Sequence, residues 1–225
     1  MTFSKGAKDG LPIGLGYFAV SFSFGIAGSK FFSWYLVTLI SMTNLTSAGQ
    51  FAGIGIIAAG GSYLEMFISQ LVINLRYSLM SISLSQKVDR DFKTPARLAL
   101  GFAVTDEIFA VASGQKEEVS KSYFLGLATL PYFGWALGTL LGGLSQDLLP
   151  QRICTALGVA LYGMFVAIVV PAVKKAKSVA IVVSIAAVLS CILYWQPWIG
   201  ISSGFQVIIC AIAASAVGAI FFPRD

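Results

Sequence analysis

Apolar residues follow one another in long runs along this chain, with few polar interruptions and no strict alternation. Uncharged runs cover residues 10–29, 31–64, 123–146, 153–173 and 178–223. A helix of about 20 apolar residues crosses the hydrocarbon core of a bilayer, whereas β-barrel strands read as short alternating segments. The pattern therefore predicts an all-α membrane protein with several transmembrane helices.

The runs divide into about six to eight membrane elements, which we interpret as one polytopic bundle in a single domain, residues 1–225. Two elements have unusual lengths. Segment 31–64 is long for one crossing and short for two, and small and polar residues over 44–50 interrupt it; segment 98–114 is short. The elements are predicted at 11–29, 31–64, 65–86, 98–114, 123–145, 153–173, 178–195 and 202–222.

The fifteen lysine and arginine residues test how these elements cross. If every element crossed once, the basic residues would be split eight to six between the two faces, with one arginine inside the membrane. If 31–64 and 98–114 enter and return to the same face, twelve lie on one face and two on the other. Because cytoplasmic loops carry an excess of basic residues, this bias favours broken or re-entrant elements and a cytoplasmic loop over 87–97. A tilted long helix is the alternative for 31–64.

Two Leu-Pro pairs, Leu11-Pro12 and Leu130-Pro131, lie in glycine-rich aromatic runs, each followed by two further apolar runs. Inverted repeats with discontinuous helices are common among secondary transporters. An internal repeat is one interpretation of these pairs, and the general likeness of glycine-rich membrane helices is the other. The ladder formed by Gly134, Gly138 and Gly142 predicts close helix packing.

Composition supports the membrane assignment. Apolar residues make up 57% of the chain and charged residues 11%, where a soluble domain carries about 25% charged residues. The net charge of +5 comes from basic residues in the loops between apolar runs, so it indicates orientation in a membrane and not binding to nucleic acid. We expect a multi-pass protein of the cytoplasmic membrane.

The chain has no histidine. A Ser-His-Asp triad and a histidine-bearing zinc site are therefore excluded, and no Gly-x-x-x-x-Gly-Lys-Ser/Thr phosphate loop is present. No lysine lies deep in an apolar run to serve a serine nucleophile. We expect no enzyme activity, no cofactor and no metal site.

Arg76 is the most informative polar residue. It lies eleven positions after Glu65 and eleven before Lys87, so about 16 Å of helix separates it from either flank and it sits near the bilayer midplane. A charge at that depth costs at least ~2.5–3.5 kcal/mol and must find a partner. The partner is either a structural ion pair between helices or a substrate.

Asp106 and Glu107 are the natural partners because they also lie deep, between Arg97 and Lys116. Two adjacent carboxylates in a low dielectric do not both ionise cheaply, so one is expected to be protonated or paired with Arg76. Such a carboxylate could bind a substrate ammonium or carry a coupling proton. The alternative is a purely structural clamp.

Gly49 and Gln50 lie in the polar interruption of segment 31–64. Free N–H groups at the start of a half-helix can hold a carboxylate, whereas Gly49 and Gly53 could equally serve close packing. Asn74 shares a helix face with Gln70 and Tyr77, and it diverges from Arg76 by about 160° on an ideal helix. Interhelical hydrogen bonding is the alternative role for that face.

Several short segments together resemble one known family. Their order and spacing over about residues 10–145 are similar to those of the AzlC-type branched-chain amino acid permeases. The segments are Leu11-Pro12-Ile13-Gly14-Leu15-Gly16-Tyr17, Phe24-Gly25, Ala48-Gly49-Gln50-Phe51, Asn74-Leu75-Arg76-Tyr77, Thr105-Asp106-Glu107 with Phe109-Ala110, and Trp135 with Gly138 and Gly142.

The resemblance implies a secondary transporter domain that exports valine, leucine or isoleucine, and a small membrane subunit of the AzlD type as partner. Within it we expect a substrate site near the midplane, with proton coupling by Asp106 or Glu107. Two departures concern substrate choice: Tyr77-Ser78 stands where the family suggests histidine, and Thr46-Ser47 where it suggests hydrophobic residues. The alternative is a non-transporting membrane subunit whose charges only hold helices together. The expected substrate-binding residues are Gly49, Gln50, Asn74, Arg76, Asp106 and Glu107.

Overall fold

The computed structural model of the chain is almost entirely helical in the part it describes. That part comprises residues 1–145, 176–195 and 203–222, with residues 152, 166, 169, 170, 173, 174 and 201. Within it, the extended backbone forms one isolated bridge between Val88 and Val119 and no sheet. The predicted all-α class is confirmed.

The described ranges contain nine helices, and four of them (α1, α4, α7 and α9) are long and apolar enough to cross a bilayer. The chain is therefore a helical, multi-pass membrane protein. The element predicted over 153–173 lies outside the continuous described stretches. The helices are α1 (Phe3–Gly28), α2 (Trp34–Thr43), α3 (Ser47–Ala58), α4 (Tyr63–Ser85), α5 (Thr94–Gly101), α6 (Asp106–Ser113), α7 (Lys121–Ser145), α9 (Lys177–Tyr194) and α10 (Ser203–Phe221).

The chain divides into two compact units, which are described separately. The first contains Met1–Gln50 and Asn74–Ala160, and the second contains Phe51–Ile73 and Leu161–Asp225. The boundaries fall within α3 and α4. In the second unit, α9 packs against α10. The Ser62 hydroxyl accepts from the Glu65 N–H at 3.2 Å and so caps the start of α4.

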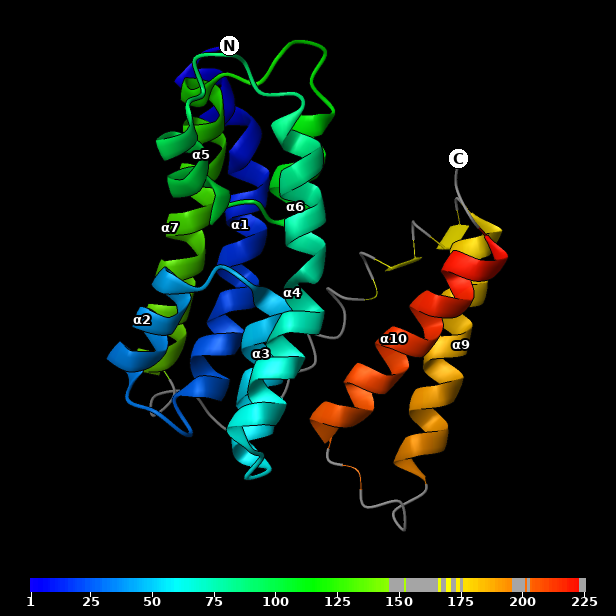
Figure 1. Cartoon of the computed structure of the whole chain (residues 1–225). Helices are drawn as coiled ribbons and strands as arrows, with labels where there is room; N and C mark the ends of the chain where they lie inside the picture. The colour runs from blue at the N-terminus through cyan, green and yellow to red at the C-terminus, as the bar shows by residue number, and fades with distance from the viewer. Residues whose placement is uncertain are drawn as a thin grey trace. The chain divides into compact units, whose positions relative to one another are not determined.

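Helices α1 and α7 form the frame of the first unit and run side by side (Figure 1). They lie parallel, because Gly134 of α7 faces Gly14 of α1 and Gly142 faces Phe22 further along both helices. A Cβ atom at Gly142 would come within 3.0 Å of the Phe22 backbone, so the small side chains allow the two backbones to touch. The packing role predicted for the glycine ladder is confirmed.

The two Leu-Pro pairs lie at the same level of this parallel pair, because Gly14 faces Leu130 and Pro131. Equivalent helices of an inverted repeat would run in opposite directions, so a repeat built on these pairs would need an axis along the helices. In chain order, a long helix followed by two short helices occurs twice, as α1 with α2–α3 and as α4 with α5–α6. The repeat itself stays a prediction.

Segment 98–114 turns back on itself, as the re-entrant interpretation predicts. Helix α5 ends at Gly101, four residues of non-helical backbone follow, and α6 begins at Asp106. The end of α6 returns to the start of the hairpin, since the Lys87 ammonium donates to the Ser113 carbonyl. Ala103 and Val104 in the break are buried, and backbone hydrogen bonds satisfy their N–H groups. Non-helical backbone at membrane depth is tolerated where protein surrounds it in this way.

Segment 31–64 is broken in a similar manner between α2 and α3. The first turn of α3 lies beside the last turn of α2, because the Gln50 amide donates to the Ser41 hydroxyl at 2.9 Å. The chain therefore turns back at the break instead of continuing as one helix. Leu45, in the break, is buried in the core of the first unit.

One end of the first unit gathers the N-terminus and the loops that carry most of its basic residues (Figure 1). The Ser120 hydroxyl donates to the Met1 carbonyl at 2.8 Å, and the Asp89 N–H donates to the Val119 carbonyl at 3.1 Å. The grouping agrees with the re-entrant interpretation of the charge pattern. The loop expected over 87–97 is shorter in the structure, because Pro95 fits the first turn of a helix and α5 begins at Thr94. Eight basic residues lie toward this end: Lys5, Lys8, Lys87, Arg90, Lys93, Arg97, Lys116 and Lys121.

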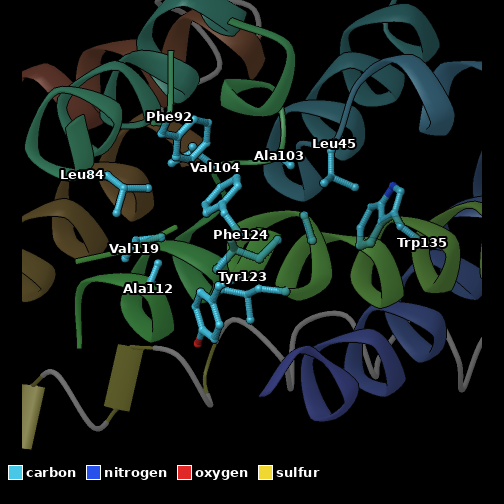
Figure 2. Close-up of a cluster of buried hydrophobic side chains, with 13 residues drawn as sticks. Leu45, Leu84, Phe92, Ala103, Val104, Ala112, Val119, Tyr123, Phe124 and Trp135 are labelled. Carbon is cyan, nitrogen blue, oxygen red and sulfur yellow. The ribbon is translucent and has the colours of Figure 1, made fainter. Parts of the chain in front are cut away.

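The buried core of the first unit lies beneath these loops and extends along α7. Figure 2 shows it as a layer of aliphatic and aromatic side chains, with Tyr123, Phe124 and Trp135 from α7. The Phe92 ring from the loop before α5 meets the Phe124 ring with centroids 6.0 Å apart. The core therefore anchors the re-entrant hairpin to the frame.

The frame predicts opposite effects at two glycines. Gly142→Ala should lower the free energy of unfolding by about 1–3 kcal/mol, because the new methyl group collides with backbone that cannot move aside. Gly16→Ala is the matched control, since nothing lies within 4 Å of a Cβ there. It should be neutral or stabilising by up to about 1 kcal/mol. Thermal and denaturant unfolding in detergent measures both, and equal stability of the two variants would contradict the packing argument.

Candidate functional site

Arg76 lies near the middle of α4, and its Nη1 atom is 2.9 Å from Oδ2 of Asp106. Its other terminal nitrogen donates to the Tyr77 hydroxyl at 3.2 Å, and the guanidinium carbon lies 4.9 Å from the centre of that ring. The predicted meeting of Arg76 with Asp106 is therefore found. The two side chains are 46% and 35% exposed, so the protein holds the pair without enclosing it.

Glu107 has a separate partner on α1. The Tyr17 hydroxyl oxygen lies 2.5 Å from Oε2 of Glu107 and 2.6 Å from the Thr105 hydroxyl oxygen. Thr105 also caps α6, because its hydroxyl accepts from the Ile108 N–H at 3.4 Å. Both acids thus occupy the first turn of α6, where the helix dipole favours negative charge. The adjacent carboxylates are held apart by two different donors.

Asn74 faces the break between α2 and α3. The Thr46 hydroxyl donates to Oδ1 of Asn74 at 2.6 Å and also lies 3.4 Å from the Tyr77 hydroxyl. Asn74 and Arg76 point in different directions, as their spacing predicts. Asn74 contacts the break before α3, whereas Arg76 contacts α6. Tyr77 connects them, because its hydroxyl contacts both Thr46 and Arg76.

Gln50 belongs to a buried hydrogen-bond network behind this face. Its amide nitrogen donates to Ser41, and its amide oxygen accepts from the Trp135 indole at 2.9 Å. Ser41 in turn shares a hydrogen bond of 2.7 Å with Thr139. Gln50 is 4% exposed with both ends of its amide occupied, which favours a positioning role for its side chain over direct contact with a ligand.

The two half-helix starts converge on one short stretch of α4. Thr46 precedes α3 and contacts Asn74 and Tyr77, whereas Asp106 begins α6 and contacts Arg76. N–H groups at a helix start lack intrahelical partners and attract anions. The arrangement combines a cation, two carboxylates and two helix starts at one level of the first unit, which suits a small zwitterion.

Most of the predicted residues are brought together here. Asn74, Arg76, Asp106 and Glu107 share the site, and Gly49 lies in the first turn of α3 next to Gln50. Sequence reasoning missed the three hydroxyl-bearing partners: Tyr17, Thr46 and Thr105. Tyr17 and Thr105 lie in the segments that carry the family resemblance. Their place in those segments was the sequence signal that could have identified them as site residues. In the described ranges no group of three or more cysteine and acidic side chains is placed to hold a metal ion.

Comparison with known proteins places this site in a family. The family described as AzlC protein matches residues 12–149, which is more than half of the chain and includes every residue of the site. The chain belongs to the AzlC family. The resemblance noted in its sequence is thereby confirmed. The matched region begins at Pro12 within α1 and includes α2 to α7.

Three relatives illustrate the spread of similar AzlC-type chains. "Inner membrane protein YgaZ" of Escherichia coli K12 is 25% identical over 98% of this chain and 92% of its own length. An "Uncharacterized membrane protein" of Archaeoglobus fulgidus is 31% identical over 76% of each chain. A membrane protein of Helicobacter pylori 26695 is 30% identical over 63% of this chain and 65% of its own. No solved structure matches the chain.

The buried network predicts energetic coupling between Gln50 and Trp135. Gln50→Leu and Trp135→Phe should each cost about 1–3 kcal/mol of unfolding free energy, because each leaves a buried polar group unpaired. The double variant should cost less than the sum, with a coupling of about 0.5–3 kcal/mol. Denaturant unfolding of all four proteins gives this value.

A control cycle uses Thr38→Val in place of Gln50→Leu. The Thr38 hydroxyl donates only to the Trp34 carbonyl among the described residues and shares no partner with Trp135. Its effect should add to that of Trp135→Phe within about 0.3–0.5 kcal/mol. Additivity in the Gln50 cycle as well would refute the network.

Proposed function

We propose that this AzlC-family protein is a secondary transporter that exports branched-chain amino acids (valine, leucine and isoleucine) across the cytoplasmic membrane. The observation that carries the proposal is the partly exposed pair of Arg76 and Asp106 at the meeting point of two half-helix starts. A charge pair at membrane depth that served only to hold helices together would be better enclosed. Discontinuous helices around such a pair are typical of transporter sites.

The roles follow from charge. Arg76, beside the positive end of the α3 dipole near Gly49, would hold the substrate carboxylate, and Asp106 would hold its ammonium. Asn74 would orient the carboxylate end through its amide. Glu107, whose carboxylate contacts the Tyr17 hydroxyl and not Arg76, would take the coupling proton. Gln50 would support the α3 start from behind.

We also propose the surroundings of the site. The chain would act as one transporter domain over residues 1–225, with the loop at 87–97 in the cytoplasm, because the basic end of the first unit carries that loop. A small AzlD-type membrane subunit would be its partner, as the family resemblance implies. No enzyme activity is part of the proposal.

Transport by purified protein tests the site. In proteoliposomes with the partner subunit and a proton gradient, wild-type protein should move labelled leucine or valine. Arg76→Gln and Asp106→Asn should each lower the initial rate about tenfold to a hundredfold, because each removes a charge-assisted contact. Arg90→Gln, in an exposed loop, is the matched control and should transport at the wild-type rate.

Charge exchange separates a substrate site from a structural ion pair. The double variant Arg76→Asp with Asp106→Arg keeps the attraction between the two positions but reverses its direction. A purely structural pair should retain folding and function, whereas an oriented substrate site should retain folding and lose transport. Restored transport in the exchanged protein would reject the proposed site in favour of the non-transporting role of the charges.

Orientation is tested by labelling in intact cells, with the native cysteines replaced. Lys93→Cys, at the basic end, should react with a membrane-impermeant maleimide only after the cells are opened. Lys30→Cys, in the connection between α1 and α2, should react from outside. Labelling in the reverse order would place residues 87–97 outside and overturn the cytoplasmic assignment.

A further inference from the structure

A cavity of about 150 Å³ lies at the basic end of the first unit, between the end of α4, helix α5 and the start of α7. Its floor is apolar and buried, and Leu84, Phe92, Val104 and Phe124 of that floor appear in Figure 2. Its outer wall is α5, which has no buried residue. The cavity is therefore apolar inside and only thinly covered outside.

Arg97 stands at the rim of this cavity. Its Nε atom donates to the Phe92 carbonyl at 2.5 Å, and the side chain is exposed. In the described part of the chain no carboxylate lies within 4.0 Å of its guanidinium. The terminal nitrogens are thus available to an anion beside an apolar hollow.

The surrounding charge favours an anion. The eight basic residues of this end exceed its five acidic residues, which are Asp9, Asp89, Asp91, Glu117 and Glu118. Anionic phospholipids concentrate on the cytoplasmic face of membranes and are attracted by basic residues near the surface. A water-soluble anion would use the arginine but gain nothing from the apolar floor, whereas a phospholipid matches both parts.

We propose that this cavity binds one anionic phospholipid. An acyl chain would lie on the apolar floor that includes Leu84 and Phe124, and the headgroup phosphate would bind Arg97. The site is separate from the Arg76–Asp106 pair. It rests on the proposed cytoplasmic position of the basic end and does not require transport activity. It would fix α5, the outer half of the re-entrant hairpin, against the frame.

Two variants remove the two halves of the site. Arg97→Gln removes the charge and leaves the cavity. Gly101→Leu fills the cavity and leaves the charge, because Gly101 lines it and nothing lies within 4 Å of a Cβ there. Arg90→Gln and Gly16→Leu are the matched controls: the first removes a basic residue that does not line the cavity, and the second adds the same side chain at another open glycine.

Native mass spectrometry of the full-length chain, titrated with phosphatidylglycerol or phosphatidylcholine of equal acyl length, measures binding. Wild-type protein should hold one phosphatidylglycerol in preference to phosphatidylcholine. Arg97→Gln should reduce that preference about fivefold. Gly101→Leu should weaken binding of both lipids, and the controls should match wild type.

Three outcomes would overturn the site. The first is equal binding of the two lipids by wild-type protein. The second is unchanged binding in both Arg97→Gln and Gly101→Leu, with thermal unfolding showing that both variants are folded. The third is competition by inorganic phosphate at the lipid's own concentration, which would assign Arg97 to free phosphate. If Gly101→Leu fails to fold, the fivefold effect of Arg97→Gln alone decides the proposal.

Discussion

The structure of the first unit depends on neutralising one guanidinium at membrane depth. Arg76 stands in the middle of a long apolar helix, where an unpaired charge would cost several kcal/mol. No carboxylate of its own helix lies within reach, so another element must bring one to that depth. The break between α5 and α6 does this, because it places the first turn of α6 beside α4. Oδ2 of Asp106 then lies 2.9 Å from Nη1 of Arg76. The cap by Thr105 and the burial of Ala103 and Val104 then make the break tolerable.

The glycine-packed pair of α1 and α7 supplies the rigid frame against which both breaks are held. Each long helix contributes one aromatic residue with a polar end. Tyr17 of α1 reaches Thr105 and Glu107 at the start of α6, and Trp135 of α7 reaches Gln50 at the start of α3. The two rings meet edge to face with centroids 5.4 Å apart. The starts of α3 and α6 are thus held by two side chains that contact each other, Trp135 and Tyr17. A shift of one helix start would therefore displace the contacts of the other.

Much of this was accessible from the sequence, for physical reasons. Membrane depth follows from counting residues along a helix, so the meeting of Arg76 with Asp106 could be predicted, and charge asymmetry indicated the return of segment 98–114. The partners of Glu107 and Gln50 could not be predicted, because Tyr17 and Trp135 look like ordinary aromatic residues in apolar runs until the register of α1 against α7 is known. That register depends on glycine contacts between segments more than a hundred residues apart, which no local pattern encodes.

The separation of the two carboxylates bears on coupling under the proposed function. Arg76 neutralises Asp106, so an arriving zwitterion can exchange partners with that pair without changing the charge of the site. Glu107 would remain as the unmatched acid, and a proton is the smallest cation that neutralises it. When Glu107 is ionised, the Tyr17 hydroxyl donates to it; when it is protonated, Glu107 donates to Tyr17, whose hydroxyl can then turn to donate to Thr105. Thr105 caps α6 one residue before Asp106. Protonation of Glu107 would therefore change the hydrogen bonding of the residue that caps the helix carrying Asp106.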